Sequence, residues 1–402
     1  MTQMGRSEQL RGRHRPRIVV APDKFRGSLS APEAAHALAR GLESGAREVE
    51  VVTLPIADGG EGTVDAAASC GYDVVAREVR GPTGLGVRAR YAVRGTTAIV
   101  ELAQSSGLNL LAADERAPLS ASTYGFGELI GHAIDGGAST VVLGLGGSAT
   151  TDGGTGMLIA MGARLTDAGD VPLGGGGGDL LEVARADFSE LRRRVAGITF
   201  ILASDVTNPL LGVRGSAAVF GPQKGAAEDD VSLLDRALER FADVVGTDGG
   251  PDLRHAAGAG AAGGVGFAAL SVLHARQSSG ATAVLDLVQF DEAARHADLV
   301  VTGEGRLDVQ SLAGKAPVEV ARRATGSGTA TVVVAGEILL EPQQLRSAGF
   351  SRWFSLLDRE PDLEQSMARA AELLAGVGAE IANDLDELTV RLGHGGLEGY
   401  GA

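Results

Sequence analysis

The chain of 402 residues contains one cysteine, Cys70, and few aromatic residues, which make up 4% of it. A single cysteine excludes a disulfide within the chain and a zinc cluster built on cysteines. No run reaches the roughly 18 apolar residues of a membrane-spanning helix. The basic first 17 residues lack the apolar stretch of a signal peptide. We therefore expect a cytoplasmic protein with no membrane partner and with a disordered arm over residues 1–16.

Basic residues are also scarce, because 36 Lys and Arg stand against 51 Asp and Glu, a net charge of −15. An acidic surface repels the phosphate backbone of nucleic acids, so no nucleic-acid partner is expected. An anionic small substrate needs local cations to overcome that field.

Glycine, in contrast, is abundant, with 60 residues. Glycine is costly inside helices and strands, so an excess indicates tight turns and close backbone approaches. The rest of the composition, 44% hydrophobic and 22% charged, is that of a globular protein. The length favours two domains. The five consecutive glycines within residues 173–179 are interpreted as a flexible surface connection.

Short β-branched runs alternate with Ala- and Leu-rich helical patterns. This alternation predicts an α/β fold with one or two mostly parallel sheets. Ser30 and Glu33 have the spacing of a capping box, which predicts a helix to about residue 42. Residues 87–93 and 96–102 predict an antiparallel hairpin. Other strands are expected at 17–21, 48–54, 140–145, 198–203, 299–302 and 330–335, and other helices at 60–70, 123–134, 229–244, 261–273, 317–324 and 362–381.

Five stretches with polar or charged groups follow predicted strands, at the usual ligand crevice of an open α/β sheet. The first, residues 21–28, holds Asp23, Lys24 and Ser28 just before a helix. Cations and a hydroxyl beside a helix N-terminus suit a carboxylate or a phosphate. The alternative is a capped turn with solvated side chains.

The second stretch, residues 55–63, carries Asp58 and Glu61 among glycines. Magnesium prefers one or two carboxylates together with phosphate oxygens, so these two acids are candidate metal ligands. The alternative is that the glycines only form a turn and Glu61 favours the helix that follows.

The third stretch, residues 143–156, is the strongest of the five. Gly146 and Gly147 expose backbone N–H groups, and Ser148 and Thr150 add hydroxyls. Together they predict a nest for a phosphate or for a transition state with spread negative charge. Asp152 is a candidate to hold a metal or accept a proton.

The fourth stretch, residues 203–210, offers Asp205 as the general base that takes the proton of an attacking hydroxyl. Asn208 is a candidate metal or hydroxyl contact, with an Asx-type turn as the alternative. Lys224 follows on a glycine-bearing turn and is a candidate charge clamp.

The fifth stretch, residues 302–317, resembles a P-loop only superficially, because alanine rather than Ser or Thr follows Lys315. Lys315 is still expected at a phosphate as a charge clamp, and Arg306 at the substrate or a phosphate. Glu304 and Asp308 are candidate metal ligands.

The remaining motifs are weaker. Gly258, Gly260 and Gly263 imitate a dinucleotide-binding fingerprint, but no convincing strand precedes them. Close helix packing is the preferred interpretation of this run. No Gly-x-Ser-x-Gly elbow and no His-x-x-x-His pair is present.

Seven segments in order closely resemble the bacterial glycerate kinase family (the type I glycerate kinases). They are APDKFRGSLSA, LPIADGGEGT, ELAQSSGL, GLGGSATTDGGTGM, DVTNPLLG, VFGPQKGA and TGEGRLDVQSLAGKAP. The resemblance runs from about residue 18 to residue 379. It implies phosphorylation of D-glycerate by ATP with Mg²⁺, to give 2-phosphoglycerate or 3-phosphoglycerate.

The resemblance also implies an α/β architecture of two domains with the active site in the crevice between them. A Rossmann-like domain, residues 17–95 plus 288–384, is expected to be interrupted by a flavodoxin-like domain, residues 96–287. Residues 385–402 are expected to form a flexible tail, and the protein to be a monomer or a homodimer.

Two other functions stay open. A kinase of another small sugar acid or polyol is one, because Gly-Leu-Gly-Gly-Ser-Ala is similar to a loop of the GHMP kinases. That loop usually has two serines and lies early in the chain. A ligand sensor on the same scaffold is the other, but a sensor tolerates loss of acids that are all present here: Asp58, Asp152, Asp205 and Glu304.

Overall fold

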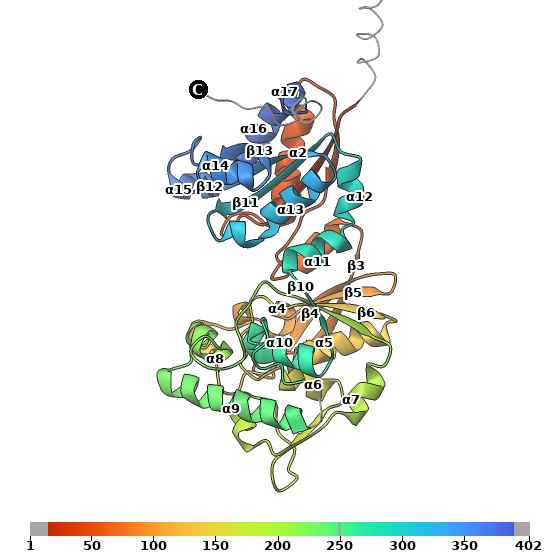
Figure 1. Ribbon diagram of the computed structural model, residues 1–402, viewed down its shortest axis with the longest axis vertical. Helices are drawn as coiled ribbons and strands as arrows, with labels where there is room; N and C mark the ends of the chain where they lie inside the picture. Colours follow the sequence, from red (N-terminus) through yellow and green to blue (C-terminus); the bar gives the residue numbers. More distant parts are fainter. Residues whose placement is uncertain (1–14, 248–250, 390–402) are drawn as a thin grey trace, which may run out of the picture. The chain divides into compact units, whose positions relative to one another are not determined.

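The computed structural model describes residues 15–247 and 251–389 (Figure 1). The chain forms two compact units, residues 1–57 with 285–402 (unit 1) and residues 58–284 (unit 2). Residues 1–14 of the predicted arm and 390–402 of the predicted tail lie outside the described residues.

Unit 1 contains a five-stranded sheet in the order β13–β12–β11–β1–β2, with every neighbouring pair parallel. Its strands are β1 (Arg17–Pro22), β2 (Glu50–Thr53), β11 (Leu299–Leu307), β12 (Ala330–Ile338) and β13 (Phe350–Ser355). Its helices are α2 (Ala31–Ser44), α12 (Phe290–Arg295), α13 (Ala316–Gly326), α14 (Pro342–Ser347), α15 (Leu363–Ala368), α16 (Ala370–Asn383) and α17 (Leu385–Thr389), and α11 (Gly280–Leu287) joins the two units in sequence.

Helices cover both faces of this sheet (Figure 1). Val332 and Val334 of β12 belong to the core that α2 and α16 complete, whereas Val333 and Ala335 belong to the core on the side of α13 and α14. A strand buried on both faces needs apolar residues in succession, which explains why β12 is a continuous apolar run. The predicted capping box of α2 is confirmed, because Glu33 N donates to Ser30 Oγ at 3.4 Å and Ser30 N donates to Glu33 Oε2 at 2.8 Å.

Unit 2 contains a six-stranded mixed sheet in the order β10–β9–β6–β5–β4–β3. The strands β5, β6, β9 and β10 are parallel, and β3, β4 and β5 form an antiparallel meander. Their bounds are β3 (Asp73–Arg80), β4 (Gly86–Arg94), β5 (Thr97–Glu101), β6 (Thr140–Gly144), β9 (Thr199–Ala203) and β10 (Arg276–Ser278), and a separate ribbon joins β7 (Arg164–Thr166) to β8 (Arg185–Asp187).

An apolar core lies between this sheet and helices of unit 2. Phe126, Phe241 and Phe267 are among its largest fully buried side chains, and the rings of Phe241 and Phe267 meet edge to face at 5.8 Å. The helices are α3 (Thr63–Ser69), α4 (Ala103–Ser106), α5 (Tyr124–Asp135), α6 (Thr155–Ala160), α7 (Ser189–Arg194), α8 (Ser216–Phe220), α9 (Glu228–Thr247) and α10 (Ala261–Ser271). The expected α/β class is therefore confirmed.

The predicted hairpin of residues 87–93 and 96–102 is present as β4 and β5. Strand β3, which the sequence reasoning missed, pairs with β4 along its whole length. Because these strands hydrogen-bond into the second sheet, the chain passes from unit 1 to unit 2 after residue 57 rather than at the expected position 95. It returns after residue 284, close to the expected 287.

Two further expectations differ from the structure. The chain continues as helix α17 over residues 385–389, where a flexible tail was expected, because Leu385 and Leu388 are buried in the core of unit 1. Strand β11 extends to Leu307, five residues beyond the expected end at 302. Gly303 allows this extension, since a Cβ there would meet the Val334 carbonyl oxygen at 2.2 Å.

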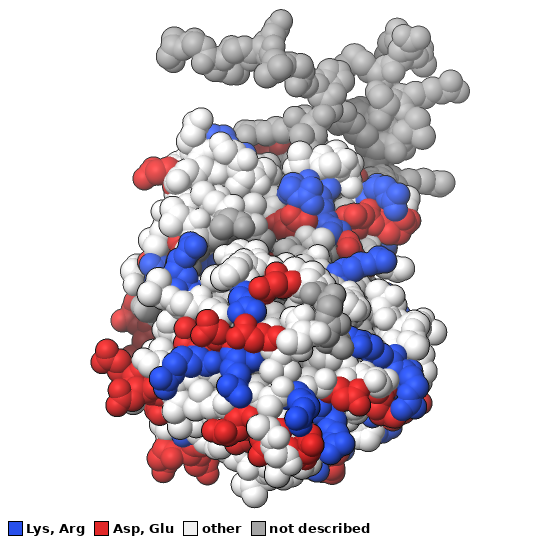
Figure 2. All heavy atoms as spheres, turned by 60° about the horizontal axis from the view of Figure 1, so that its bottom comes forward, with Lys and Arg blue, Asp and Glu red and all other residues white. Residues whose placement is uncertain are grey.

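Acidic and basic side chains lie interspersed over the face drawn in Figure 2. The excess of acidic residues is therefore not gathered into one block on that face. Among the described residues, no helix is both long and apolar enough to cross a membrane.

Candidate functional site

Three of the predicted stretches meet in unit 2 at the carboxyl ends of the parallel strands β5, β6 and β9. A Cβ on Gly146 would lie 2.5 Å from the Gly60 Cα, and one on Gly59 would lie 2.9 Å from the Ala203 carbonyl oxygen. The second, third and fourth stretches therefore touch through their backbones. This is the edge at which open α/β sheets bind ligands.

The loop of residues 144–156, which we call the glycine-hydroxyl loop, connects β6 to α6. Ser148 and Thr150 lie with their hydroxyl oxygens 3.0 Å apart, and both side chains are buried. Gly147 is exposed and has a φ of 73°, a conformation that favours glycine. The loop thus presents exposed backbone over buried hydroxyls.

Asp152 anchors this loop from within. Its carboxylate accepts hydrogen bonds from Thr123 N (2.8 Å), Thr123 Oγ1 (2.6 Å), Gly154 N (3.1 Å) and Gly156 N (3.2 Å). Burial raises the pKa of the Asp152 carboxyl, and these donors lower it in part. A fully buried carboxylate with four donors does not fit the predicted role as a metal ligand or proton acceptor.

Lys224, the predicted charge clamp, points into the same loop. Its side chain is only 2% exposed, and Nζ donates to the Thr150 carbonyl oxygen and, at 3.5 Å, to Ser148 Oγ. Burial lowers the pKa of Lys224 to about 7, and the charge of Asp152 opposes that shift. The lysine therefore binds the loop itself.

Two glycine segments support the glycine-hydroxyl loop from behind. A Cβ on Gly177 would lie 2.4 Å from the Thr151 carbonyl oxygen, and one on Gly263 would lie 1.9 Å from the Thr150 carbonyl oxygen. Gly153 N also donates to the Gly263 carbonyl at 2.9 Å. The run within 173–179 is thus buried packing at residues 175–177 rather than the expected surface connection. The run 258–264 is close packing, as interpreted from the sequence.

The Asp58 loop, residues 58–62, lies beside Gly146. Asp58 Oδ1 accepts Gly60 N at 3.1 Å, and Glu61 Oε1 accepts Asn109 Nδ2 at 3.3 Å. Asp58 is half-buried and Glu61 is exposed. These two predicted metal residues therefore lie three residues apart in one loop that contacts the glycine-hydroxyl loop.

Asp205, the predicted base, is exposed at the end of β9. Its Oδ1 accepts Gly280 N at 3.0 Å. A Cβ on Gly280 would in turn meet the Asp58 carbonyl oxygen at 1.7 Å, so Asp205 stands near the Asp58 loop. Asn208 Nδ2 donates to the Arg214 carbonyl at 2.8 Å, which supports the turn alternative for this residue.

In unit 1 the first and fifth stretches lie side by side, because β1 and β11 are parallel neighbours with Pro22 opposite Gly303. Asp23 Oδ1 accepts Lys24 N at 2.7 Å, and Ser28 Oγ donates to the Phe25 carbonyl at 3.1 Å. Asp23 is buried, Lys24 is half-buried, and the Ser28 contact belongs to a turn.

Glu304 is the most unusual carboxylate of unit 1. It is 7% exposed, and its Oε1 is buried without a hydrogen-bond partner. Burial raises the pKa of the Glu304 carboxyl, whereas the Ser311 hydroxyl and the Lys315 ammonium lower it. A buried oxygen without a donor is costly unless a ligand or water meets it.

The other predicted residues of the fifth stretch lie closer to the surface. Lys315 is the N-cap residue of α13, and Arg306 faces Glu337 with an Nε–Oε2 distance of 3.4 Å. Asp308 Oδ1 accepts Gln310 N at 2.8 Å and Ser311 N at 3.3 Å. Asp308 therefore closes a turn with one of its carboxylate oxygens.

The predicted metal residues are divided between the units, with Asp58, Glu61 and Asp152 in unit 2 and Glu304 and Asp308 in unit 1. Among the described residues, no three or more His, Cys, Asp or Glu side chains gather so as to hold a metal ion. A Mg²⁺ already bound to phosphates needs only one or two protein carboxylates, which is the number that Asp58 and Glu61 offer on one loop.

Sequence reasoning missed Glu101, the last residue of β5. Its carboxylate is 1% exposed and accepts hydrogen bonds from Val64 N and, at 3.3 Å, from Gln104 Nε2. An acid at the end of the apolar strand 97–101, within the segment ELAQSSGL, was the available signal.

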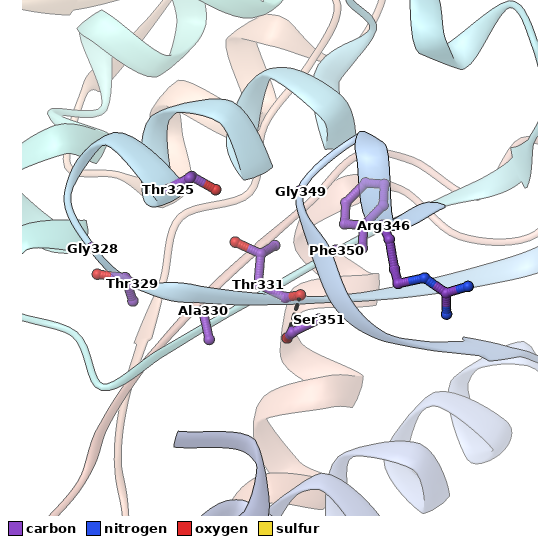
Figure 3. Close-up of a pocket in the computed structure, with 9 residues that line it drawn as sticks. All are labelled: Thr325, Gly328, Thr329, Ala330, Thr331, Arg346, Gly349, Phe350 and Ser351. Atoms are coloured by element: carbon purple, nitrogen blue, oxygen red, sulfur yellow. Dashed lines mark hydrogen bonds between the residues drawn. The ribbon is translucent and has the colours of Figure 1, made fainter. Parts of the chain in front are cut away.

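A pocket of about 240 Å³ lies in unit 1 at the amino ends of β12 and β13 (Figure 3). Thr331, which has an unpartnered buried hydroxyl, and Arg346 are among its lining residues. None of the predicted site residues lines it, since they follow the carboxyl ends of the strands.

Comparison with known proteins assigns the chain to a class. The glycerate kinase family matches residues 18–386. A glycerate kinase of Bacillus subtilis (strain 168) is 42% identical over 91% of this chain and 97% of its own length. A glycerate 2-kinase of Escherichia coli (strain K12) is 39% identical over 92% and 98%.

A solved structure from Salmonella typhimurium LT2, provisionally assigned as a glycerate kinase 2, has the same fold. Its TM-score is 0.82 at 38% identity, and the alignment covers 93% of this chain and 99% of that one. The chain is thus a phosphotransferase of α/β fold, and it belongs to the glycerate kinase family. The predicted activity, ATP-dependent phosphorylation of glycerate, is confirmed at that level.

Proposed function

We propose that the enzyme transfers the γ-phosphoryl group of ATP to the 2-hydroxyl of D-glycerate, giving 2-phosphoglycerate and ADP. The observation that carries the site assignment is the contact between the Asp58 loop, the glycine-hydroxyl loop and the end of β9. The choice of the 2-hydroxyl is supported by the name of the Escherichia coli relative, a glycerate 2-kinase.

Asp205 is the proposed base. The substrate hydroxyl oxygen forms a bond to the γ-phosphorus while the bond from that phosphorus to the β–γ bridging oxygen breaks, and Asp205 accepts the hydroxyl proton. Its exposed carboxylate is the predicted acid of unit 2 that is neither buried under a loop nor part of a metal pair. Phosphoryl transfer asks the protein mainly for such positioning and for charge neutralisation.

The glycine-hydroxyl loop is the proposed phosphate cradle. Exposed N–H groups near Gly146 and Gly147 face developing negative charge, while Ser148 and Thr150 fix the loop from below. Lys224 is assigned to holding the loop through the Thr150 carbonyl, in place of a direct clamp on phosphate.

Magnesium is proposed to arrive as the MgATP complex, and when bound it neutralises charge on the β- and γ-phosphoryl oxygens. Asp58 and Glu61 are the residues that would hold it, since a Mg²⁺ bound to phosphates needs only one or two carboxylates. In unit 1, Lys315 and Arg306 are the proposed phosphate contacts, and the unpartnered Glu304 Oε1 is a proposed ligand contact.

At the level of architecture, we propose that unit 1 is the Rossmann-like domain and unit 2 the inserted flavodoxin-like domain. The parallel sheet with helices on both faces supports the first assignment. A cytoplasmic location fits the use of ATP.

The product isomer is tested by incubating the enzyme with D-glycerate, MgATP and enolase, with and without phosphoglycerate mutase. Formation of phosphoenolpyruvate without the mutase is the expected result and identifies 2-phosphoglycerate. A signal that needs the mutase assigns the 3-hydroxyl instead. ADP release with other sugar acids or polyols, but not with D-glycerate, would overturn the assigned substrate.

A further inference from the structure

Glu101 is a buried carboxylate to which the proposed function gives no role. It ends β5 and pairs in register with Gly144, the first residue of the glycine-hydroxyl loop. Its side chain is 1% exposed, so it does not contact bulk solvent and is not placed to bind a substrate directly. Burial raises the pKa of its carboxyl, while hydrogen bonds from Val64 N and Gln104 act in the opposite direction.

One donor to this carboxylate comes from the start of helix α3, directly after the Asp58 loop, and the other is Gln104. Val64 N donates to Oε1, and the backbone of Gly62 acts to lower the pKa of the same carboxyl. Gly62 has a φ of 97° and precedes helix α3, so it is the turn through which the Asp58 loop enters that helix. The Val64 N–H at this junction therefore has Glu101 as its acceptor.

The backbone of the Asp58 loop is packed over the same point. A Cβ on Gly144 would lie 2.8 Å from the Gly59 carbonyl oxygen and 3.6 Å from the Glu101 Cγ. Thr63 Oγ1 also donates to the Gly60 carbonyl at 2.7 Å, which closes the turn on its other side. The strand end, the first residue of the glycine-hydroxyl loop and the Asp58 loop thus meet at Glu101.

We infer that Glu101 is a positioning residue: it fixes the junction of residues 62–64 and thereby holds Asp58 and Glu61 against the glycine-hydroxyl loop. This inference rests on the proposed role of Asp58 and Glu61 toward MgATP. Replacing the carboxylate leaves the buried Val64 N–H without its acceptor, and such groups are rarely tolerated without rearrangement. The rearrangement moves the Asp58 loop.

The experiment measures loop order and substrate binding separately. Hydrogen–deuterium exchange of peptides that cover residues 58–70 is compared in wild type, Glu101→Gln and Glu101→Leu. Glutamine keeps one acceptor oxygen but directs an amide at another donor, whereas leucine keeps no acceptor. Exchange is expected to be fastest in Glu101→Leu and intermediate in Glu101→Gln. Glu128→Gln is the matched control, because Glu128 is a carboxylate of unit 2 that accepts a backbone N–H, Arg80 N, outside these loops.

Steady-state kinetics then give KM for MgATP and for glycerate. In Glu101→Leu the KM for MgATP is expected to rise about tenfold or more, since small displacements of positioning groups carry large kinetic costs. The KM for glycerate is expected to stay within about threefold. Glu101→Gln should lie between, and Glu128→Gln should match wild type. If Glu101→Leu does not fold, exchange rates and KM values are compared between wild type and Glu101→Gln alone.

Unchanged exchange over residues 58–70 in both Glu101 variants overturns the inference. So does faster exchange with both KM values unaltered or raised equally, provided that Asp58→Asn raises the KM for MgATP. If Asp58→Asn itself leaves that KM unchanged, the proposed role of Asp58 fails, and the exchange data alone then decide whether Glu101 anchors the loop.

Discussion

Lys224 and Lys315 both lie beside glycine in a turn, yet they differ in what they contact. Lys224 is 2% exposed, and its Nζ donates to the Thr150 carbonyl inside unit 2. Lys315 is half-buried at the start of α13 in unit 1, close enough to lower the pKa of Glu304. Residue type and local turn were alike, so the difference comes from the loop that covers Lys224.

The same contrast holds for the two sets of candidate residues. In unit 2 the buried side chains of Asp152 and Lys224, which we call the buried anchors, hold the glycine-hydroxyl loop by hydrogen bonds. In unit 1 the candidate residues are charged side chains near Glu304, whose Oε1 is buried without a partner. Substitutions of the buried anchors in unit 2 should therefore act on stability and catalysis together. Substitutions of Lys315 or Arg306 in unit 1 should act on ligand binding with little effect on stability.

The largest effect is expected for Asp205→Asn, because a general base contributes about 10²–10⁴-fold to rate. We expect kcat to fall within that range while the urea midpoint stays close to wild type, since asparagine keeps an acceptor for Gly280 N. Asp308→Asn in unit 1, whose carboxylate closes a turn, is the control and should retain kcat within about threefold. A loss below about tenfold in Asp205→Asn would argue against the base role.

A large loss of stability is expected for Gly263→Ala. The new Cβ would lie 1.9 Å from the Thr150 carbonyl oxygen, at a φ of 74° that favours glycine. Overpacking and the backbone conformation together should lower the free energy of unfolding by about 3 kcal/mol or more. The control is Gly314→Ala in unit 1, because Gly314 has a φ of 100° and an added Cβ there would meet no atom within 4 Å. Its expected loss of about 1 kcal/mol therefore measures the cost of the backbone conformation alone. Equal shifts in urea unfolding for the two variants would contradict the packing role.

Lys224→Met and Lys315→Met are expected to differ in which property they change, stability or ATP use, with smaller effects than the two variants above. Lys315→Met should lower kcat/KM for ATP by about tenfold, the loss of one charged contact, with an unchanged urea midpoint. Lys224→Met should change both the urea midpoint and kcat, because the glycine-hydroxyl loop loses a donor to Thr150. The reverse pattern would show that Lys224 acts on phosphate and Lys315 on the fold.

The effect that is most gradual is a dependence of stability on pH. Lys224 has a pKa of about 7 in the folded protein, below the ordinary value of 10.5 that the unfolded chain has. Between these values the unfolded state binds more protons, so the free energy of unfolding rises with pH, by at most about 1.4 kcal/mol per pH unit. Below pH 7 both states are protonated and this contribution is constant.

Urea unfolding of wild type and Lys224→Met at pH 6, 7, 8 and 9 tests this sign. The difference, wild type minus variant, should grow from pH 7 upward and stay flat below it. Lys315→Met should show the wild-type dependence. A difference that shrinks with rising pH would mean that the buried lysine is stabilised in its charged form.

Much of the fold followed from the sequence, because apolar runs and caps are local signals. The helix after Ser30 and the strands β6, β9 and β12 lie where they were predicted. Strand β3 was missed because five of its eight residues are exposed and its pattern is weakly apolar. Without β3 the chain seemed to change domain at residue 95.

The sequence predicted which segments form the candidate site better than it predicted the role of each residue in them. Asp205 and the glycines of residues 144–156 lie together because they follow β9 and β6, neighbouring parallel strands whose ends meet at one edge of a sheet. Asp58 follows β2 of the other sheet and joins them through the contact of Gly60 with Gly146. Asp152 and Lys224 look catalytic in sequence, yet both are buried under the loop that they hold. Burial of a charged residue depends on contacts with distant segments, such as Thr123 for Asp152, which local patterns do not contain.

The glycine segments behind the glycine-hydroxyl loop have a consequence for how the enzyme changes over generations. Where backbone lies directly on backbone, at Gly177 and Gly263, no rotamer is available to absorb a new methyl group. A substitution on either side then needs a compensating one on the other before the protein is viable. Amino-acid substitutions in these segments should therefore accumulate slowly and in pairs, one on each side of the contact. New substrate preferences should arise first at the exposed acids and cations around the loop.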